Sequence, residues 1–127
     1  MQKRNIDAPD APMPASPYSQ AVEVTGATRT LYVSGQVGSE PDGTTPENVA
    51  SQARLVWRNL EAQLRAAGMN FDNLVKITTI LTDATNISAS RTARAAALGE
   101  RRPASTLIIG GLASPAWKIE IEAIAVE

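Results

Sequence analysis

The segment from Val49 to Ala67 constrains the fold most, because its apolar residues recur at spacings of three and four. These residues are Val49, Ala53, Val56, Trp57, Leu60, Leu64 and Ala67. The period predicts an amphipathic helix of about five turns with one apolar stripe. Thr45 is the expected N-cap, Pro46 fits the first helical position, and Gly68 is expected to end the helix. Trp57 lies on the stripe and is interpreted as a core residue.

Five segments have the β-branched or alternating residues of strands. They are residues 21–24, 30–35, 73–82, 105–109 and 117–126. The turn-like residues between the first two predict a hairpin. A shorter helix is expected to begin near Ser88 or Ser90 and to stop at Gly99. The resulting order, β-β-α-β-α-β-β, predicts an α+β domain with a mixed sheet and both helices on one face.

Residues 1–16 are rich in proline and predict a flexible N-terminal arm, which leaves residues 17–127 as the folded domain. Within the domain, the segment Thr78–Leu81 has apolar residues at both parities of a strand. The sheet face that the helices leave uncovered therefore also needs cover. We expect self-association to supply it.

Composition excludes several kinds of chemistry. The chain has no histidine and no cysteine, so a Ser-His-Asp triad, a thiolate nucleophile and an ordinary zinc site are all excluded, and no metal site is expected. Its 12 basic and 13 acidic residues give a net charge of −1, which argues against a nucleic-acid partner. No apolar run approaches the ~18 residues of a membrane span, so no membrane partner is expected. The lack of cysteine favours a cytoplasmic location.

Several blocks of sequence carry a family resemblance in order and spacing. They are Ser16–Ala21, Val33–Gln36, Asn59-Leu60 with Ala66–Gly68, Pro103–Ser105, and Lys118–Val126. Together they resemble the YjgF/Rid family, the reactive-intermediate deaminases, over roughly residues 12–126. The terminal strand is the closest of these matches.

The resemblance implies a fold like that of chorismate mutase from bacilli, assembled as a homotrimer with a central barrel. It also implies that a small-molecule substrate binds in clefts between subunits. Typical members of the family hydrolyse reactive imines and enamines, above all 2-imino acids, without a cofactor. No cofactor is therefore expected here.

Two carboxylates, Glu120 and Glu122, share one face of the last strand, because strand side chains alternate. The strand pattern alone favours a solvated face for both. The resemblance instead gives Glu120 the role of the carboxylate that orients the attacking water. A carboxylate can take a proton from that water without histidine. Glu122 has no such counterpart and is interpreted as structural.

Other candidate substrate-binding residues follow from the same resemblance. Tyr18 matches a cleft-lining tyrosine, although packing at the start of a strand is an equal alternative. Ser34 is expected to present a hydroxyl or backbone group to the cleft, and Gly35 either lines it or permits a bulge. Thr106 replaces a serine and can donate a hydrogen bond, while Leu107 makes the pocket more apolar than the family's usual cysteine.

Ser105 departs from the family pattern. Deaminases of this family have an arginine there, which grips the carboxylate of the substrate with two hydrogen bonds. Its loss is expected to weaken recognition of 2-imino acids by about ten- to a thousandfold. The arginines that could replace it are Arg91, Arg94, Arg101 and Arg102. Asn86 is the candidate for an asparagine that the family has nearby.

Two functions remain open from the sequence. The first is hydrolytic deamination of an imine or enamine other than a simple 2-imino acid, with water positioned by Glu120. The second is a non-catalytic trimer that binds a small metabolite in the same clefts. Retention of Glu120 favours the enzyme, and loss of the arginine favours a binder or a changed substrate.

Overall fold

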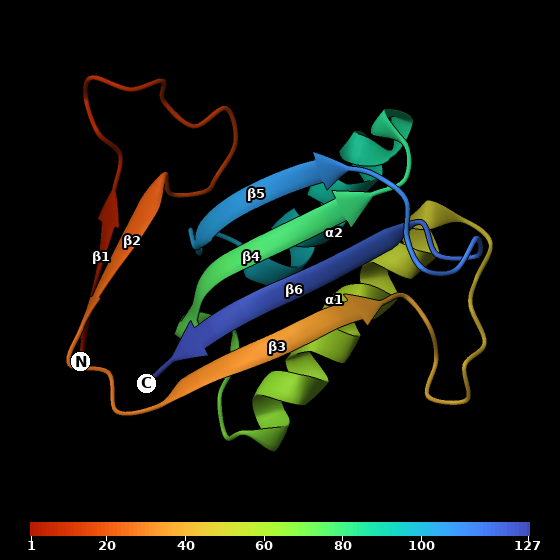
Figure 1. Ribbon diagram of the computed structural model, residues 1–127, viewed down its shortest axis with the longest axis horizontal. Coiled ribbons are helices and arrows are strands. Elements are labelled where there is room, and N and C mark those ends of the chain that lie inside the picture. The colour runs from red at the N-terminus through yellow and green to blue at the C-terminus, as the bar shows by residue number, and fades with distance from the viewer.

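The computed structural model describes all 127 residues and contains a four-stranded sheet in the order β3-β6-β4-β5 (Figure 1). The strands are β3 (Thr30–Val37), β4 (Leu74–Leu81), β5 (Ala104–Ile109) and β6 (Ile119–Val126). β4 and β5 are parallel, whereas β6 runs antiparallel to both β3 and β4. The predicted mixed sheet is therefore confirmed.

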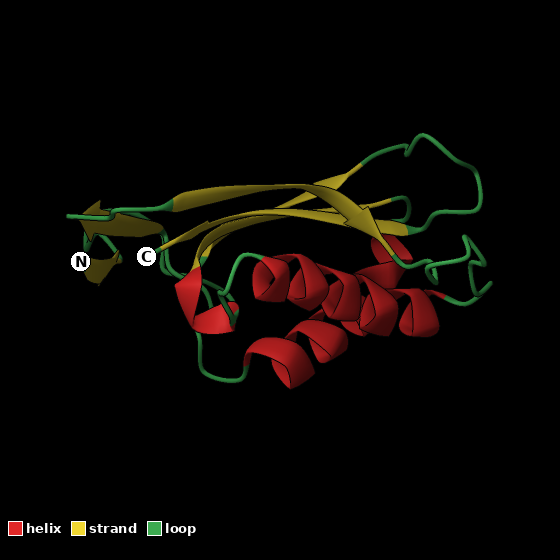
Figure 2. Cartoon of the chain, turned by 90° about the horizontal axis from the view of Figure 1, so that it is seen from below, coloured by secondary structure: helices red, strands yellow, loops and turns green.

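Two helices, α1 (Val49–Ala66) and α2 (Ile87–Leu98), pack on one face of this sheet, as predicted (Figure 2). The apolar stripe of α1 and the inner face of the sheet form one core. Trp57 is 4% exposed and meets the ring of Phe71 edge-on, with 5.9 Å between centroids. Two short 3-10 helices, η1 (Phe71–Asn73) and η2 (Ala84–Asn86), precede β4 and α2. Neither α1 nor α2 is long and apolar enough to cross a bilayer.

The ends of α1 differ in how well the sequence predicts them. The N-cap is Asn48, whose side-chain oxygen accepts the Ser51 N–H at 2.8 Å, so the prediction of Thr45 is wrong. The Thr45 hydroxyl instead shares a hydrogen bond of 2.6 Å with Ser39. At the other end Gly68 has φ +72°, which confirms the predicted left-handed stop.

The N-terminal segment departs from the prediction. Strand β1 (Gln2–Ile6) pairs antiparallel with β2 (Ala21–Thr25) in a separate two-stranded sheet (Figure 1). The expected hairpin between residues 21–24 and 30–35 is therefore wrong, because β3 pairs with β6 instead. The expected arm of residues 1–16 contains a regular strand.

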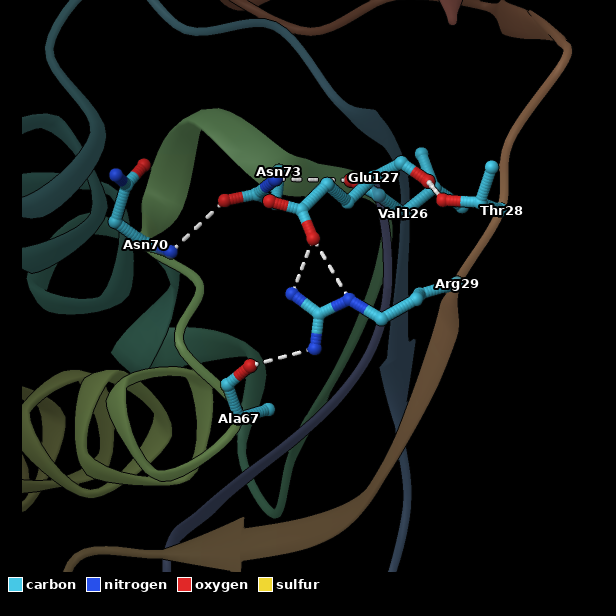
Figure 3. Close-up of polar contacts among 7 residues, drawn as sticks. All are labelled: Thr28, Arg29, Ala67, Asn70, Asn73, Val126 and Glu127. Atoms are coloured by element: carbon cyan, nitrogen blue, oxygen red, sulfur yellow. Dashed lines mark hydrogen bonds and ion pairs between the residues drawn. The ribbon is translucent and has the colours of Figure 1, made fainter.

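Hydrogen bonds connect the C-terminal end of β6 with the start of β3 and with the segments after α1 and before β4 (Figure 3). The Arg29 guanidinium donates to the Glu127 carboxylate at 2.7 Å and to the Ala67 carbonyl at 2.8 Å. The Asn73 amide donates to the Val126 carbonyl at 2.9 Å. These contacts join the start of β3, the end of α1 and the end of β6, and so fix the strand that carries Glu120.

The start of β6 is held by Gln52, a fully buried residue of α1. Its side-chain nitrogen donates to the carbonyls of Pro46 at 2.7 Å and Ala116 at 3.0 Å. Its side-chain oxygen accepts the Lys118 N–H at 2.8 Å. One amide thus satisfies three backbone groups and fixes the chain two residues before Glu120.

Candidate functional site

The predicted site residues Tyr18, Ser105 and Leu107 line one cavity of about 160 Å³. In the parallel register, Ser105 pairs with Ile77 and Leu107 with Thr79, both buried on the helix side of the sheet. The side chains of Ser105 and Leu107 therefore face the helices, at the outer edge of the sheet. The cavity lies between β5, the segment before β2, and the helices.

Tyr18 is brought to this cavity by its neighbour Ser19. The buried Ser19 donates its hydroxyl to the Arg102 carbonyl at 2.6 Å and its N–H to the Pro103 carbonyl at 3.3 Å. Arg102 also donates to the Tyr18 carbonyl at 3.0 Å. These bonds attach the segment before β2 to the chain entering β5, so Tyr18 is held beside Ser105.

The predicted residues Ser34, Gly35, Thr106 and Glu120 lie on the other face of the sheet. Glu120 alternates with Ile119 and Ile121, which are both buried against the helices. Thr106 pairs with Thr78 and accepts a hydrogen bond of 2.6 Å from Lys76. The site residues expected from the sequence thus form two groups on opposite faces of one sheet.

Glu120 is placed by a glycine in the neighbouring strand. Ser34 and Gly35 lie at an irregularity in the pairing of β3 with β6, between Val33 and Gln36. A Cβ atom at Gly35 would lie 2.6 Å from Cδ of Glu120. Only glycine therefore lets the carboxylate lie against the β3 backbone at this bulge. The Glu120 carboxylate enters none of the five ion pairs of the chain.

The cavity also contains Trp57 and Ser90, to which sequence reasoning gave no site role, and Arg91 and Arg94, which it gave as possible replacements for the missing arginine. Trp57 is a core residue, as predicted, but it forms part of the cavity wall as well. Ser90, Arg91 and Arg94 line the cavity from α2. Arg94 follows Ser90 by four residues and Arg91 by three, and such spacings bring side chains together on one side of a helix. This spacing was the signal available in the sequence. Asn86 is not among the lining residues and precedes α2 without a side-chain capping bond.

Arg94 makes two interactions with the segment around Tyr18. Its guanidinium donates to the Pro17 carbonyl at 2.8 Å and lies 5.8 Å from the centre of the Tyr18 ring. Burial lowers the pKa of Arg94 from its ordinary value, with Tyr18 acting in the opposite direction and Arg91 in the same direction. The side chain is half-buried but stays cationic at neutral pH, because an arginine pKa starts so high.

The structure contains no group of three or more Asp, Glu, His or Cys residues that could hold a metal ion. The cavity instead offers two guanidinium groups, three serine hydroxyls, a tyrosine and an apolar wall. These groups can bind a small polar molecule with an anionic end.

A family model described as endoribonuclease L-PSP matches residues 8–127, which is nearly the whole chain. The chain belongs to the YjgF/Rid family. Among its Rid relatives, the mouse (Mus musculus) protein named 2-iminobutanoate/2-iminopropanoate deaminase is 35% identical over 127 residues, covering 98% of this chain and 92% of the relative. The family assignment made from the sequence is confirmed.

Two solved Rid structures have the same fold. The Rid protein YyfB from Yersinia pestis has a TM-score of 0.85 at 30% identity and covers 100% of both chains. RidA from the Antarctic bacterium Psychrobacter sp. PAMC 21119 has a TM-score of 0.74 at 31% identity, covering 98% of this chain and 99% of that one. The expected chorismate-mutase-like α+β fold is thereby confirmed.

Proposed function

We propose that this chain is a hydrolytic deaminase of a reactive imine or enamine, with Glu120 positioning the attacking water. The observation that carries the proposal is the Glu120 carboxylate, packed over Gly35 on the uncovered sheet face and without a cationic partner. Deaminase relatives that match along the whole chain support the reaction class. A cytoplasmic location is part of the proposal.

The reaction needs little beyond this carboxylate. A protonated imine is already electrophilic, so water adds to its carbon once it is held in place. Glu120 takes a proton from that water as the new C–O bond forms. Glu120 then returns that proton to the nitrogen, which leaves as ammonia, and the ionised carboxylate accepts the hydroxyl proton as the C=O bond forms. This proton passes to ammonia, so the balance is one protonated imine and one water in, one carbonyl compound and one ammonium ion out.

A homotrimer is also part of the proposal, with each substrate site shared between two subunits. Within one chain, Glu120 and the cavity beside Ser105 lie on opposite faces of the sheet. A second copy packed on the uncovered face can bring its own cavity to the Glu120 carboxylate. The exposed apolar residues of that face support this packing, since Tyr32 is 75% exposed and Ile108 is 45% exposed.

The substrate is proposed to differ from the simple 2-imino acids that the mouse relative is named for. Ser105 has a hydroxyl where the family's arginine would provide a charged fork. Because the hydroxyl is neutral, it cannot hold a carboxylate at that position with comparable strength.

The same serine favours a second function, that of a non-catalytic trimer binding a small metabolite. A binder would keep the cavity but would not need Glu120 to accept a proton. The two functions differ in what Glu120→Gln does: an enzyme loses turnover and keeps its affinity, whereas a binder has no turnover to lose.

The test follows imine hydrolysis directly. An amino-acid oxidase generates 2-iminobutanoate in the presence of semicarbazide, and the protein is scored by how much it prevents semicarbazone formation. We expect Ser105→Arg to increase the acceleration, and Glu120→Gln to reduce it by about 10²- to 10⁴-fold. Because Ser105→Arg restores the family's arginine, the proposal would be wrong if this variant were folded and yet inert on imines of short and long amino acids.

A further inference from the structure

The cavity beside Ser105 is cationic, although the residue at position 105 is not. Helix α2 carries Arg91 and Arg94, both lining the cavity, and no acidic residue lies between Asp83 and Glu100. An adjoining cavity of about 210 Å³ shares Arg91 and Arg94 and adds Arg101. The positive charge around Tyr18 therefore comes from α2 and the loop that follows it.

These arginines differ in whether their charge is already neutralised. Arg101 pairs with Asp72 at 2.6 Å, and Arg102 pairs with Asp7 at 2.9 Å. Arg91 and Arg94 enter none of the ion pairs of the chain. Arg91 and Arg94 are thus the available cations at this cavity.

Arg94 is the better placed of these two. Among the arginines without a carboxylate partner it alone is half-buried, whereas Arg54, Arg65 and Arg91 are exposed. A cation removed from water without a counter-ion is unfavourable, and a bound anion recovers much of that cost. The bond to the Pro17 carbonyl and the contact with Tyr18 fix the guanidinium in advance, so little side-chain freedom is lost on binding.

We propose that Arg94, assisted by Arg91, binds the carboxylate of the substrate from helix α2, in place of an arginine on β5. The hydroxyls of Ser90 and Ser105 line the same cavity and supply further hydrogen bonds. The substrate class is an imine of a small carboxylic acid, held in a different position from a 2-imino acid gripped from β5. The inference rests on the proposed function for the imine, but the carboxylate site itself does not depend on turnover.

Binding of three probes tests the site without any reaction. The probes are 2-oxobutanoate, 4-oxopentanoate and the neutral ketone 2-pentanone, titrated into the intact protein by NMR or calorimetry. We expect at least one keto acid to bind ten times more tightly than the ketone. Arg94→Gln should weaken that keto acid about ten- to a hundredfold, and Arg94→Lys should weaken it less, because the charge remains.

Two controls separate charge from folding. Arg65→Gln removes an exposed arginine of α1 that does not line the cavity, and it should leave affinity unchanged. Arg54→Gln removes a second exposed arginine of α1 that does not line the cavity, and it should leave the preference for the acid over the ketone intact. Equal affinity for acid and ketone, no binding of any probe, or undiminished keto-acid affinity in a folded Arg94→Gln would each overturn the inference.

Hydrolysis assays on the same variants separate this inference from the proposed function. Turnover in wild type with an unchanged KM in Arg94→Gln overturns the role of Arg94 and leaves the deaminase intact. Keto-acid binding that depends on Arg94, without hydrolysis of any imine, supports the carboxylate site and overturns the proposed deaminase.

Discussion

The side chain of Glu120 occupies the space that a methyl group on residue 35 would need: a Cβ on Gly35 would lie 2.6 Å from Cδ of Glu120. Real Cβ atoms do not approach this closely, so an alanine here must push the carboxylate aside. The Glu120 carboxylate lies where a side chain at position 35 would begin, and its placement therefore depends on a residue that has no side chain. Gly35→Ala tests this dependence.

We expect Gly35→Ala to lower kcat/KM for imine hydrolysis by about a hundredfold, since small misplacements of a catalytic group have effects of that size. Circular dichroism should show a folded protein. Gly111→Ala is the matched control, because nothing lies within 4 Å of a Cβ built there. Full activity in Gly35→Ala would contradict the role given to the Glu120 position.

Gln52→Ala is expected to lower the free energy of unfolding by about 3 kcal/mol, because it removes a fully buried side chain and leaves three partly buried backbone groups without partners. The affected groups are the carbonyls of Pro46 and Ala116 and the N–H of Lys118. Urea denaturation measures the change. Gln63→Ala, on the exposed side of α1, should stay within about 0.5 kcal/mol of wild type. Equal effects of the two variants would count against this role for Gln52.

Asn48→Ala should destabilise the protein by about 1 kcal/mol, because it removes the acceptor for the Ser51 N–H. Asn48→Asp keeps an acceptor and adds a negative charge at the positive end of α1, so it should retain wild-type stability or exceed it. Thermal melts of the two variants at neutral pH make the comparison. Equal losses in both would show that the cap does not act through this acceptor.

Asp83 and Asp42 should become protonated only at a pH lower than is usual for aspartate. Hydrogen bonds from the Thr85 N–H and hydroxyl lower the pKa of Asp83 below 3.8, and bonds from Thr44 do the same for Asp42. A depressed pKa in the fold means that the stabilisation is present above the unfolded pKa and disappears as pH falls through the folded one. Carboxyl NMR titration should report both values below 3.8. Thr85→Val should raise the pKa of Asp83 only partly, since the larger contribution from the backbone N–H remains.

Light scattering should give a mass about three times the 13.4 kDa of one chain. Ile108→Lys places a charge on the uncovered face, beside Ile80, and should yield smaller species. Ala62→Lys, on the exposed side of α1, should leave the assembly unchanged. A wild-type monomer at micromolar concentration would refute the trimer and the shared site together.

The sequence predicts those elements whose signals are local. The end of α1 at Gly68 and the end of α2 at Gly99 follow from spacing and glycine, and the structure agrees; α2 begins at Ile87, one residue before Ser88 and three before Ser90. The start of α1 does not follow from the sequence, because Thr45 and Asn48 can each cap a helix and Pro46 fits a first helical position. The contact of the Thr45 hydroxyl with Ser39 depends on a loop that periodicity does not describe.

Strand pairing is the part that sequence reasoning missed. β1 (Gln2–Ile6) has four exposed residues and no apolar alternation, so nothing marked it as the partner of β2. β3 pairs with β6, which is nearly a hundred residues away along the chain. The short turn between β2 and β3 resembled a hairpin, but pairing between distant segments is set by the core that they jointly cover.

The sequence predicted many of the residues of the candidate site, but it did not predict how they are arranged in space. Strand parity correctly places Glu120 and Glu122 on one face, away from the core. The separation of Ser105 from Thr106 also follows from parity, once β5 is paired with β4. That Arg94 lies beside Tyr18 could not be inferred, because it depends on how α2 packs across the sheet.

The division of the predicted site between two sheet faces has a genetic consequence in the proposed trimer. A chain with Glu120→Gln keeps an intact cavity, and a chain with Arg94→Gln keeps an intact carboxylate. When the two impaired proteins are unfolded and refolded together, mixed trimers contain some clefts with both an intact carboxylate and an intact cavity. Two defective alleles then complement each other in one cell, whereas a single chain carrying both changes impairs the two clefts to which it contributes.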